Sequence, residues 1–215
     1  MTAHVMRSRL RPMLFLVILA VLAGGVLAIV EQSTRPRIEA NRTAATMRGL
    51  KALLPDKGYD NEPHSDVVLL SRITALGAAE PLPAYRARLG GQPVAAVLTV
   101  TAPDGYVGSI RLLVSVAADG RVLGARVVQH TETPGLGDGI EADKSDWILA
   151  FNGRSASDPA ASGWSLQRDG GDFDQLTGAT ITSRAVVNAI HNALLYFDAH
   201  RDEVFAALSS SPMEN

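Results

Sequence analysis

The amino-terminal part of the chain contains a hydrophobic segment long enough to cross a membrane. Residues 13–30 form an uninterrupted apolar run without a charge. As a helix this run spans about 27 Å, close to the roughly 30 Å thickness of a bilayer's hydrocarbon core. Arg7, Arg9 and Arg11 precede the run and Glu31 follows it. This excess of positive charge predicts a cytoplasmic amino terminus (residues 1–12) and a body on the far side of the membrane.

A cleaved signal peptide is the alternative interpretation of this segment. The run is longer than the hydrophobic region of a usual signal peptide, and no convincing Ala-x-Ala cleavage site precedes Glu31. Arg35 and Arg37 weaken the charge asymmetry, but they lie further from the run. We therefore expect residues 13–30 to remain as a transmembrane helix.

The segment after this anchor has the composition of a helix. Thr34 is a suitable N-cap with Pro36 in the turn that follows, and helix-compatible residues continue to Leu54. Pro55 and Gly58 are expected to end the helix. Because many of its positions are polar, we expect residues 31–58 to be a helical linker that lifts the body off the bilayer without being deeply buried.

The body then shows the apolar–polar alternation that is typical of strands. A short strand is expected at Val67–Leu70, and two hairpin signals follow, each with paired turn residues between two alternating segments. The hairpin strands are Tyr85–Leu89 and Val94–Thr101 around Gly90-Gly91, and Ile110–Val116 and Val122–Val128 around Asp119-Gly120. These segments should pair into an antiparallel sheet.

Helical spacing returns in the last third of the chain. The recurring apolar residues predict a long helix that begins near Ser183, its natural N-cap; they are Val186, Val187, Ile190, Leu194 and Phe197. Shorter helices are expected at Lys144–Phe151 and Glu203–Leu208, with a loop rich in Gly, Ser and Asp at residues 152–172. Helices and an antiparallel sheet segregate along the chain, which predicts an α+β fold for residues 59–215, with flanking helices.

Composition narrows the possible functions. The formal net charge of −2 argues against a nucleic-acid-binding protein, and a hydrophobic content of 47% is enough for a buried core. The chain has no cysteine, which excludes disulfides, Cys-ligated iron–sulfur clusters, attached c-type haem and a thiol nucleophile. The histidines are scattered without metal-ligand spacing, so no metal site is predicted.

Ten residues before the long helix concentrate the candidate chemistry. Residues 174–183 read Asp-Gln-Leu-Thr-Gly-Ala-Thr-Ile-Thr-Ser. The unpaired N–H groups and positive dipole end of a helix N-terminus favour a phosphate there, and Gly178 lets the backbone approach a ligand closely. An ordinary N-cap turn is the alternative, because hydroxyl residues are common before helices.

A second glycine-rich loop follows the last predicted strand. Residues 130–138 read His-Thr-Glu-Thr-Pro-Gly-Leu-Gly-Asp, with backbone N–H groups available to a planar ligand. A plain connection between strand and helix is the alternative, in which His130 is structural rather than bonded to a ligand. A dinucleotide site is disfavoured because Pro134 lies in the wrong place, the strand belongs to a hairpin and no partner βαβ unit follows.

These motifs resemble those of a known family. Residues 174–182 are similar to the flavinylation motif of covalent FMN-binding domains, Asp-x-x-Ser/Thr-Gly-Ala-Thr-x-Thr. In that family a separate flavin transferase uses FAD to attach FMN to the second threonine through a phosphoester bond. The 130–138 loop, the segment Gly105–Ile110 and the amino-terminal anchor resemble the G subunits of Rnf (Rsx) electron-transport complexes.

The resemblance implies where the flavin is held. Thr180 takes the position of the threonine that carries FMN, and Asp174 belongs to the flavinylation motif. The other residues that it implies for cofactor binding are Thr177, Gly178, Ala179, Thr182 and Ser183 in the motif, and Glu132, Thr133, Leu136 and Gly137 beside the isoalloxazine ring.

The resemblance also implies a function. An inner-membrane subunit with its main domain in the periplasm would relay electrons, without turnover of its own, in a complex that couples ferredoxin/NAD electron transfer to ion translocation. Its partners would be the other subunits, the flavin transferase and membrane lipid. Two alternatives stay open: an anchored extracytoplasmic binding or scaffold module without flavin, and the related C subunit of a sodium-pumping NADH:quinone reductase.

Overall fold

The computed structural model describes residues 2–54, 58–70 and 73–206. Within it the chain divides into two compact units, residues 1–44 and residues 45–215. The described residues of the first unit are all helical, and the second unit contains a sheet with helices on both of its faces.

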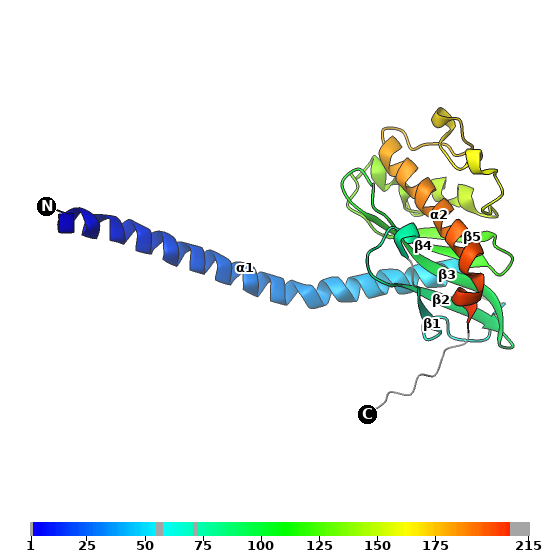
Figure 1. Cartoon of the computed structure of the whole chain (residues 1–215), viewed down its shortest axis with the longest axis horizontal. Helices are drawn as coiled ribbons and strands as arrows, with labels where there is room; N and C mark the ends of the chain where they lie inside the picture. The colour runs from blue at the N-terminus through cyan, green and yellow to red at the C-terminus, as the bar shows by residue number, and fades with distance from the viewer. Residues whose placement is uncertain (1, 55–57, 71–72, 207–215) are drawn as a thin grey trace, which may run out of the picture. The chain divides into compact units, whose positions relative to one another are not determined.

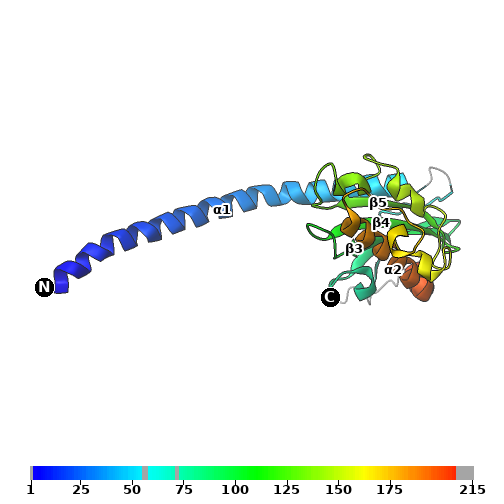
Figure 2. The same ribbon diagram turned by 90° about the horizontal axis from the view of Figure 1, so that it is seen from above.

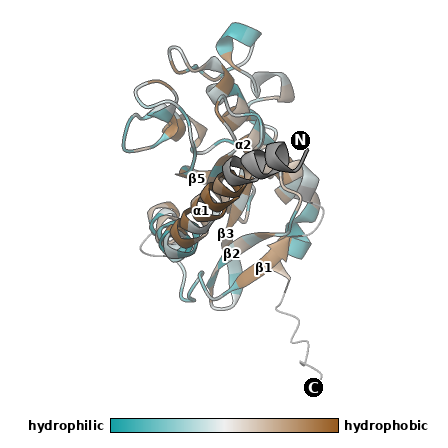
Figure 3. Ribbon diagram, turned by 90° about the vertical axis from the view of Figure 1, so that its left-hand side faces the viewer, coloured by the Kyte–Doolittle hydropathy of each residue, from teal (hydrophilic) through white to brown (hydrophobic). Residues whose placement is uncertain are grey.

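The first unit belongs to helix α1 (Thr2–Leu53), whose hydrophobic part is brown in Figure 3. Within α1, the segment from Met13 onward is long and apolar enough to cross a membrane, with a mean hydropathy of 3.0 over its most apolar window and none of that window buried. The predicted transmembrane run therefore lies within a continuous helix, and the side chains of this run are exposed.

The predicted helix start at Thr34 is wrong, because α1 runs through this position without a break. The Thr34 hydroxyl donates to the carbonyl of Val30 at 2.8 Å, one turn back along the helix. A threonine inside a helix can satisfy its hydroxyl in this way, so it need not mark the start of a helix. The predicted end is close to the observed one, which is Leu53.

The second unit is built around a five-stranded antiparallel sheet (Figure 1). Its strands are β1 (Val67–Leu70), β2 (Leu82–Leu89), β3 (Gln92–Ala102), β4 (Ile110–Ala117) and β5 (Val122–Gln129). They lie in the sheet in chain order, each paired with the next. Both predicted hairpins and the short first strand are confirmed, and β2 and β3 are a few residues longer than expected.

The main hydrophobic core lies between the sheet and helix α2 (Thr180–Phe205), which crosses one face of the sheet in Figure 1. Alternate residues of the strands, such as Leu98, Val100 and Val114, point toward this helix and are fully buried. From the helix, Val186 and Ile190 complete the core. These are apolar positions of the predicted helical pattern, so the pattern identified the buried face correctly.

The last turns of α1 cover the opposite face of the sheet (Figure 2). Leu50 and Leu53 are buried there against Val97 and Leu113. A Cβ atom on Gly49 would lie 2.8 Å from the Leu113 Cδ1 atom, so a larger residue there would require the Leu113 side chain to shift. The end of the predicted linker is therefore part of the second unit's core, which its mixed polar sequence did not indicate.

The short helix predicted at Lys144–Phe151 is present, as a 3₁₀ helix that begins three residues later than expected. The whole segment between β5 and α2 contains short helices of this kind. These 3₁₀ helices are η2 (Gly137–Ile140), η3 (Trp147–Phe151), η4 (Ala161–Gly163) and η5 (Gln167–Asp169). A further 3₁₀ helix, η1 (Ile73–Leu76), lies earlier in the chain, between β1 and β2. Phe151 stacks on Phe173 with ring centroids 4.7 Å apart, and Trp164 lies 4.9 Å from Phe173. This aromatic cluster anchors the long loop against the core.

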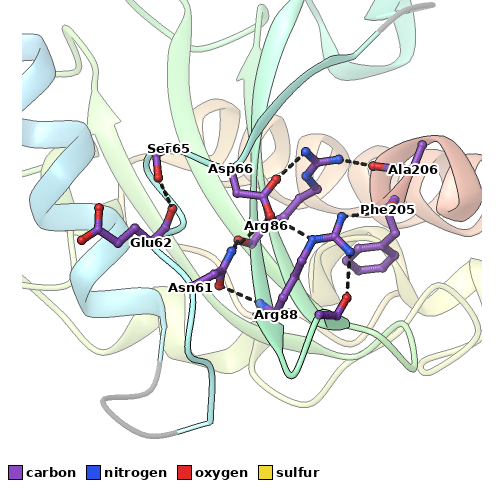
Figure 4. Close-up of polar contacts among 9 residues, drawn as sticks. Asn61, Glu62, Ser65, Asp66, Arg86, Arg88, Phe205 and Ala206 are labelled. Atoms are coloured by element: carbon purple, nitrogen blue, oxygen red, sulfur yellow. Dashed lines mark hydrogen bonds and ion pairs between the residues drawn. The ribbon is translucent and has the colours of Figure 1, made fainter. Parts of the chain in front are cut away.

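The carboxyl end of α2 is held by a buried ionic cluster (Figure 4). Arg86 on β2 is 1% exposed, pairs with Asp66 and donates to the carbonyl of Ala206. Arg88 donates to the same carboxylate at 2.9 Å and to the carbonyl of Phe205 at 3.0 Å. The shorter helix predicted at Glu203–Leu208 corresponds to the last part of α2, which follows a kink at His200, where the backbone is not helical. The last two residues of that prediction, Ala207 and Leu208, lie outside the described residues.

Candidate functional site

The two motifs and the glycine-rich turn around Tyr106 meet at one cavity of about 310 Å³. The start of α2, the loop after β5 and the β3–β4 turn each contribute to its wall. It is lined by Tyr106, Glu132, Thr133, Leu136, Gly137, Gly178, Ala179, Thr180, Ile181 and Thr182. All four residues expected beside a flavin ring are in this wall, together with four of the expected motif residues.

Two of the expected cofactor-binding residues lie outside this wall. Thr177 is exposed and lines a neighbouring depression with Leu136 and Gly139. Ser183 is fully buried. Its hydroxyl donates to the carbonyl of Ala179 and accepts from the N–H of Leu176, each at 3.0 Å. Ser183 therefore closes the turn that shapes the motif.

The predicted start of the long helix at Ser183 is wrong by about one turn. The helix begins at Thr180, and its N-cap is Ala179, which makes no side-chain capping bond. Gly178 precedes it with φ +78°, a left-handed conformation that favours glycine. The first N–H groups of a helix have no intrahelical partner. In α2 these N–H groups belong to residues 180–182, which line the cavity.

The Thr180 hydroxyl lies between a cation and an amide. The Nη1 atom of Arg168 donates to the Thr180 oxygen at 3.2 Å, and the hydroxyl donates to the Oε1 atom of Gln175 at 3.4 Å. Thr180 is half-buried, so its oxygen can be reached from outside the fold. The sequence motif did not point to Arg168, because this residue lies 12 positions before Thr180 and reaches Thr180 only through the path of the η5 loop.

Asp174 does not enter the cavity. Its side chain is exposed and accepts a hydrogen bond from the N–H of Gln175 at 2.7 Å, while its carbonyl accepts from the Trp147 indole at 2.8 Å. The carboxylate therefore shapes the turn before Thr180 and faces outward.

Glu132 joins all three segments around the cavity. Its carboxylate is only 4% exposed and accepts from the Thr182 hydroxyl at 2.5 Å and from the Val107 N–H at 3.2 Å. A Cβ atom on Gly137 would lie 2.8 Å from the Glu132 Cβ, and one on Gly105 would lie 2.8 Å from its Oε1 atom. The glycines of both loops are therefore needed for the backbone to pass this carboxylate.

His130 is structural. Its Nδ1 atom accepts from the Glu132 N–H at 3.1 Å, so in the neutral ring the proton is on Nε2, which lies 3.0 Å from the Glu141 carboxylate. This arrangement fixes the start of the loop, and His130 is not part of the cavity wall.

The residues present fit a flavin mononucleotide. Helix N–H groups and a guanidinium beside Thr180 suit a phosphate. The exposed side chains of Tyr106 (66%), Leu136 and Ile181 provide apolar surface for a planar ring. Sequence patterns did not single out Ile181, which is an exposed apolar residue next to Thr180.

Comparison with known proteins identifies the class and then the family. Residues 105–195 match the FMN-binding domain family and include every residue of the cavity wall. The second unit thus contains an FMN-binding domain. Residues 1–53 match the RnfG N-terminal region.

Relatives that align over nearly their whole length are named as G subunits of one kind of complex. The chain is 50% identical to the G subunit of the ion-translocating oxidoreductase complex of Pseudomonas aeruginosa strain UCBPP-PA14 over 206 residues, which cover 96% of each chain. It is 44% identical to the corresponding G subunit of Pseudoalteromonas atlantica, over 90% of each chain. The chain belongs to the family of G subunits of ion-translocating oxidoreductase complexes, and α1 makes it a membrane-anchored member.

Proposed function

We propose that this protein carries FMN as a phosphoester on Thr180 and relays electrons within an ion-translocating oxidoreductase complex. The observation that carries this proposal is the Thr180 hydroxyl itself. It is half-buried at the first position of α2, at the wall of the cavity, with a guanidinium 3.2 Å away. A phosphate attached to this oxygen would be next to unpaired helix N–H groups and a positive charge.

The ring of the flavin would occupy the cavity between Tyr106, Leu136 and Ile181. Thr133 and Gly137 line the same cavity, and the buried Glu132 forms part of its wall. A flavin passes one or two electrons, and the surrounding protein sets its potential through hydrogen bonds and charge. Because the wall is partly exposed, the ring edge would remain accessible to a neighbouring electron donor or acceptor.

A covalent link suits the location that we propose for this domain. The basic residues before the anchor favour an amino terminus in the cytoplasm and residues 59–215 in the periplasm of a bacterial inner membrane. A flavin that dissociated there could not be recovered from a local pool. A phosphoester prevents that loss, so the site can leave the ring open to its redox partners.

The partners follow from the family and the chemistry. The named relatives are subunits of an ion-translocating oxidoreductase complex, so the other subunits are the expected electron donor and acceptor. A flavin transferase that uses FAD would attach the FMN, and we propose that it recognises the outward-facing Asp174. If Asp174→Ala were flavinylated at the wild-type rate, this role for Asp174 would be contradicted.

In-gel fluorescence tests the attachment directly. Full-length protein from cells that contain the flavin transferase should give a fluorescent band under ultraviolet light after denaturation and washing. Thr180→Ala should give a dark band at equal protein amount, and Thr180→Ser should restore fluorescence because it keeps the hydroxyl. Thr74→Ala changes an exposed threonine outside both the motif and the cavity wall, and this variant should fluoresce.

A dark wild-type band from such cells would favour the second candidate, an anchored binding or scaffold module without flavin. The exposed apolar residues around the cavity are the feature that would suit such a module. A fluorescent Thr180→Ala band would instead place the flavin on another residue.

A further inference from the structure

The wall of the flavin cavity contains no cationic side chain among its ten residues, and its one charged member is the acidic Glu132. A phosphate on Thr180 carries negative charge, and a cation that compensates this charge must therefore come from outside the wall. The side chain that approaches the Thr180 oxygen from outside is Arg168, whose Nη1 atom lies 3.2 Å away.

The fold fixes the position of Arg168 by several contacts. The next residue, Asp169, accepts from Arg184 on the first turns of α2, at 2.7 Å from Nη2 and 3.0 Å from Nε. On the other side, the N–H of Gln167 donates to the carbonyl of Phe173 at 2.7 Å, and Gly170 turns the chain with φ +91°. The η5 loop is thus attached at both ends beside Thr180.

The ion pair between Asp169 and Arg184 leaves the guanidinium of Arg168 available to bind a phosphate. Arg184 and Asp169 neutralise each other, and within the described part of the chain no carboxylate pairs with the guanidinium of Arg168. A guanidinium has five N–H donors in a planar fork that matches phosphate oxygens. With one N–H on the Thr180 oxygen, the others can bind the remaining oxygens of a phosphate at that atom.

We propose that Arg168 is the phosphate-binding residue of flavin attachment and that the Asp169–Arg184 pair is its positioning contact. This inference rests on the proposed attachment at Thr180. During attachment the Thr180 oxygen forms a bond to the flavin-side phosphorus of FAD, and the bond from that phosphorus to the bridging oxygen breaks. AMP leaves with the electron pair, and the hydroxyl proton passes to a basic group of the transferase. Arg168 lies where negative charge builds up on the phosphoryl oxygens.

The test measures the rate of flavin incorporation by mass spectrometry, using purified full-length protein in detergent, flavin transferase and a range of FAD concentrations. Arg168→Gln should lower the rate at saturating FAD by roughly 10- to 100-fold, as expected for the loss of a hydrogen bond to a charged group. Arg168→Lys should recover part of the rate, because it restores the charge but not the planar fork of donors. Asp169→Asn should fall between wild type and Arg168→Gln.

Arg121→Gln is the matched control. Arg121 is also exposed, and its guanidinium donates to the Gly153 carbonyl at 3.0 Å, outside the cavity wall. Its variant should be flavinylated at the wild-type rate. Because Arg168 is exposed, thermal denaturation of Arg168→Gln should match that of the wild-type protein.

The outcomes separate this inference from the proposed function. Wild-type protein without flavin on Thr180 would contradict the proposed function itself. Wild-type protein loaded on Thr180, together with an unchanged rate in Arg168→Gln, would overturn only the role of Arg168. Equal losses in the Gln and Lys variants, or a loss accompanied by a lower melting temperature, would also overturn it.

Discussion

At the scale of single residues, one buried carboxylate organises the flavin site. Glu132 accepts from Thr182 on α2 and from the N–H of Val107 in the β3–β4 turn, and it belongs to the loop after β5. The sequence predicted Glu132 as part of the ring wall. It could not predict the bonding partners, because they are 25 and 50 residues away and meet only in the fold.

Removal of this carboxylate should destabilise the domain. Glu132→Ala leaves a buried hydroxyl and a buried N–H without their acceptor, which should lower the free energy of unfolding by about 2–4 kcal/mol. Glu132→Gln should cost less, since it keeps one acceptor oxygen and a similar volume. Denaturant unfolding measures both, with Glu62→Ala as a control because the Glu62 side chain is 75% exposed. Equal stability of Glu132→Ala and Glu62→Ala would contradict this role.

The residues that carry a motif were predictable, and those that support them were not. Thr180 and Gly178 follow from a ten-residue pattern that encodes local chemistry, and the structure places both in the cavity wall. Arg168 reaches Thr180 from a loop whose path depends on the aromatic cluster around Phe173. No local pattern specifies a path of that kind.

At the scale of elements, the strands were easier to predict than the ends of the helices. Hairpin strands combine alternation with a turn signal, so β2 to β5 were located within a few residues. Helix α2 begins three residues before its expected N-cap, because Ser183 uses its hydroxyl to close the preceding turn. That shift makes Thr180 the first helical residue, where a phosphate benefits most from the N–H groups.

The clamp at the other end of α2 yields a prediction about stability. Asp66→Asn removes the carboxylate that pairs with the buried Arg86 and with Arg88, which hold the last carbonyls of the helix. Leaving a buried guanidinium unpaired should lower the free energy of unfolding by roughly 3 kcal/mol. Asp119→Asn is the control, since its pair with Arg121 is long and exposed and should contribute almost nothing. Denaturant titration of both variants tests this, and similar midpoints would count against the clamp.

At the scale of the whole molecule, the chain combines an apolar helix with a domain that has its own core. The anchor was predictable from composition, because bilayer thickness sets the length of the apolar run. The packing of Leu50 and Leu53 against the sheet was not predictable. A few apolar residues in a mostly polar helix do not indicate which surface of the protein they pack against. The side of the membrane on which the domain lies follows from charge alone and calls for its own test.

The absence of cysteine makes that topology test simple. We expect a single cysteine in place of the exposed Ser157 to react with a membrane-impermeant maleimide in cells whose outer membrane has been permeabilised. Ser8→Cys, before the anchor, should react only after the inner membrane is disrupted. The reverse pattern of labelling would place the flavin domain in the cytoplasm and contradict the proposed orientation.

The most direct test of the central claim is a mass spectrum of the peptide that contains Thr180, taken from the protein isolated in its native membrane complex. Fragmentation should locate an added FMN, less one water, on the Thr180 side chain, with Thr177 and Thr182 unmodified. A peptide recovered in full yield with an unmodified Thr180 would contradict the account.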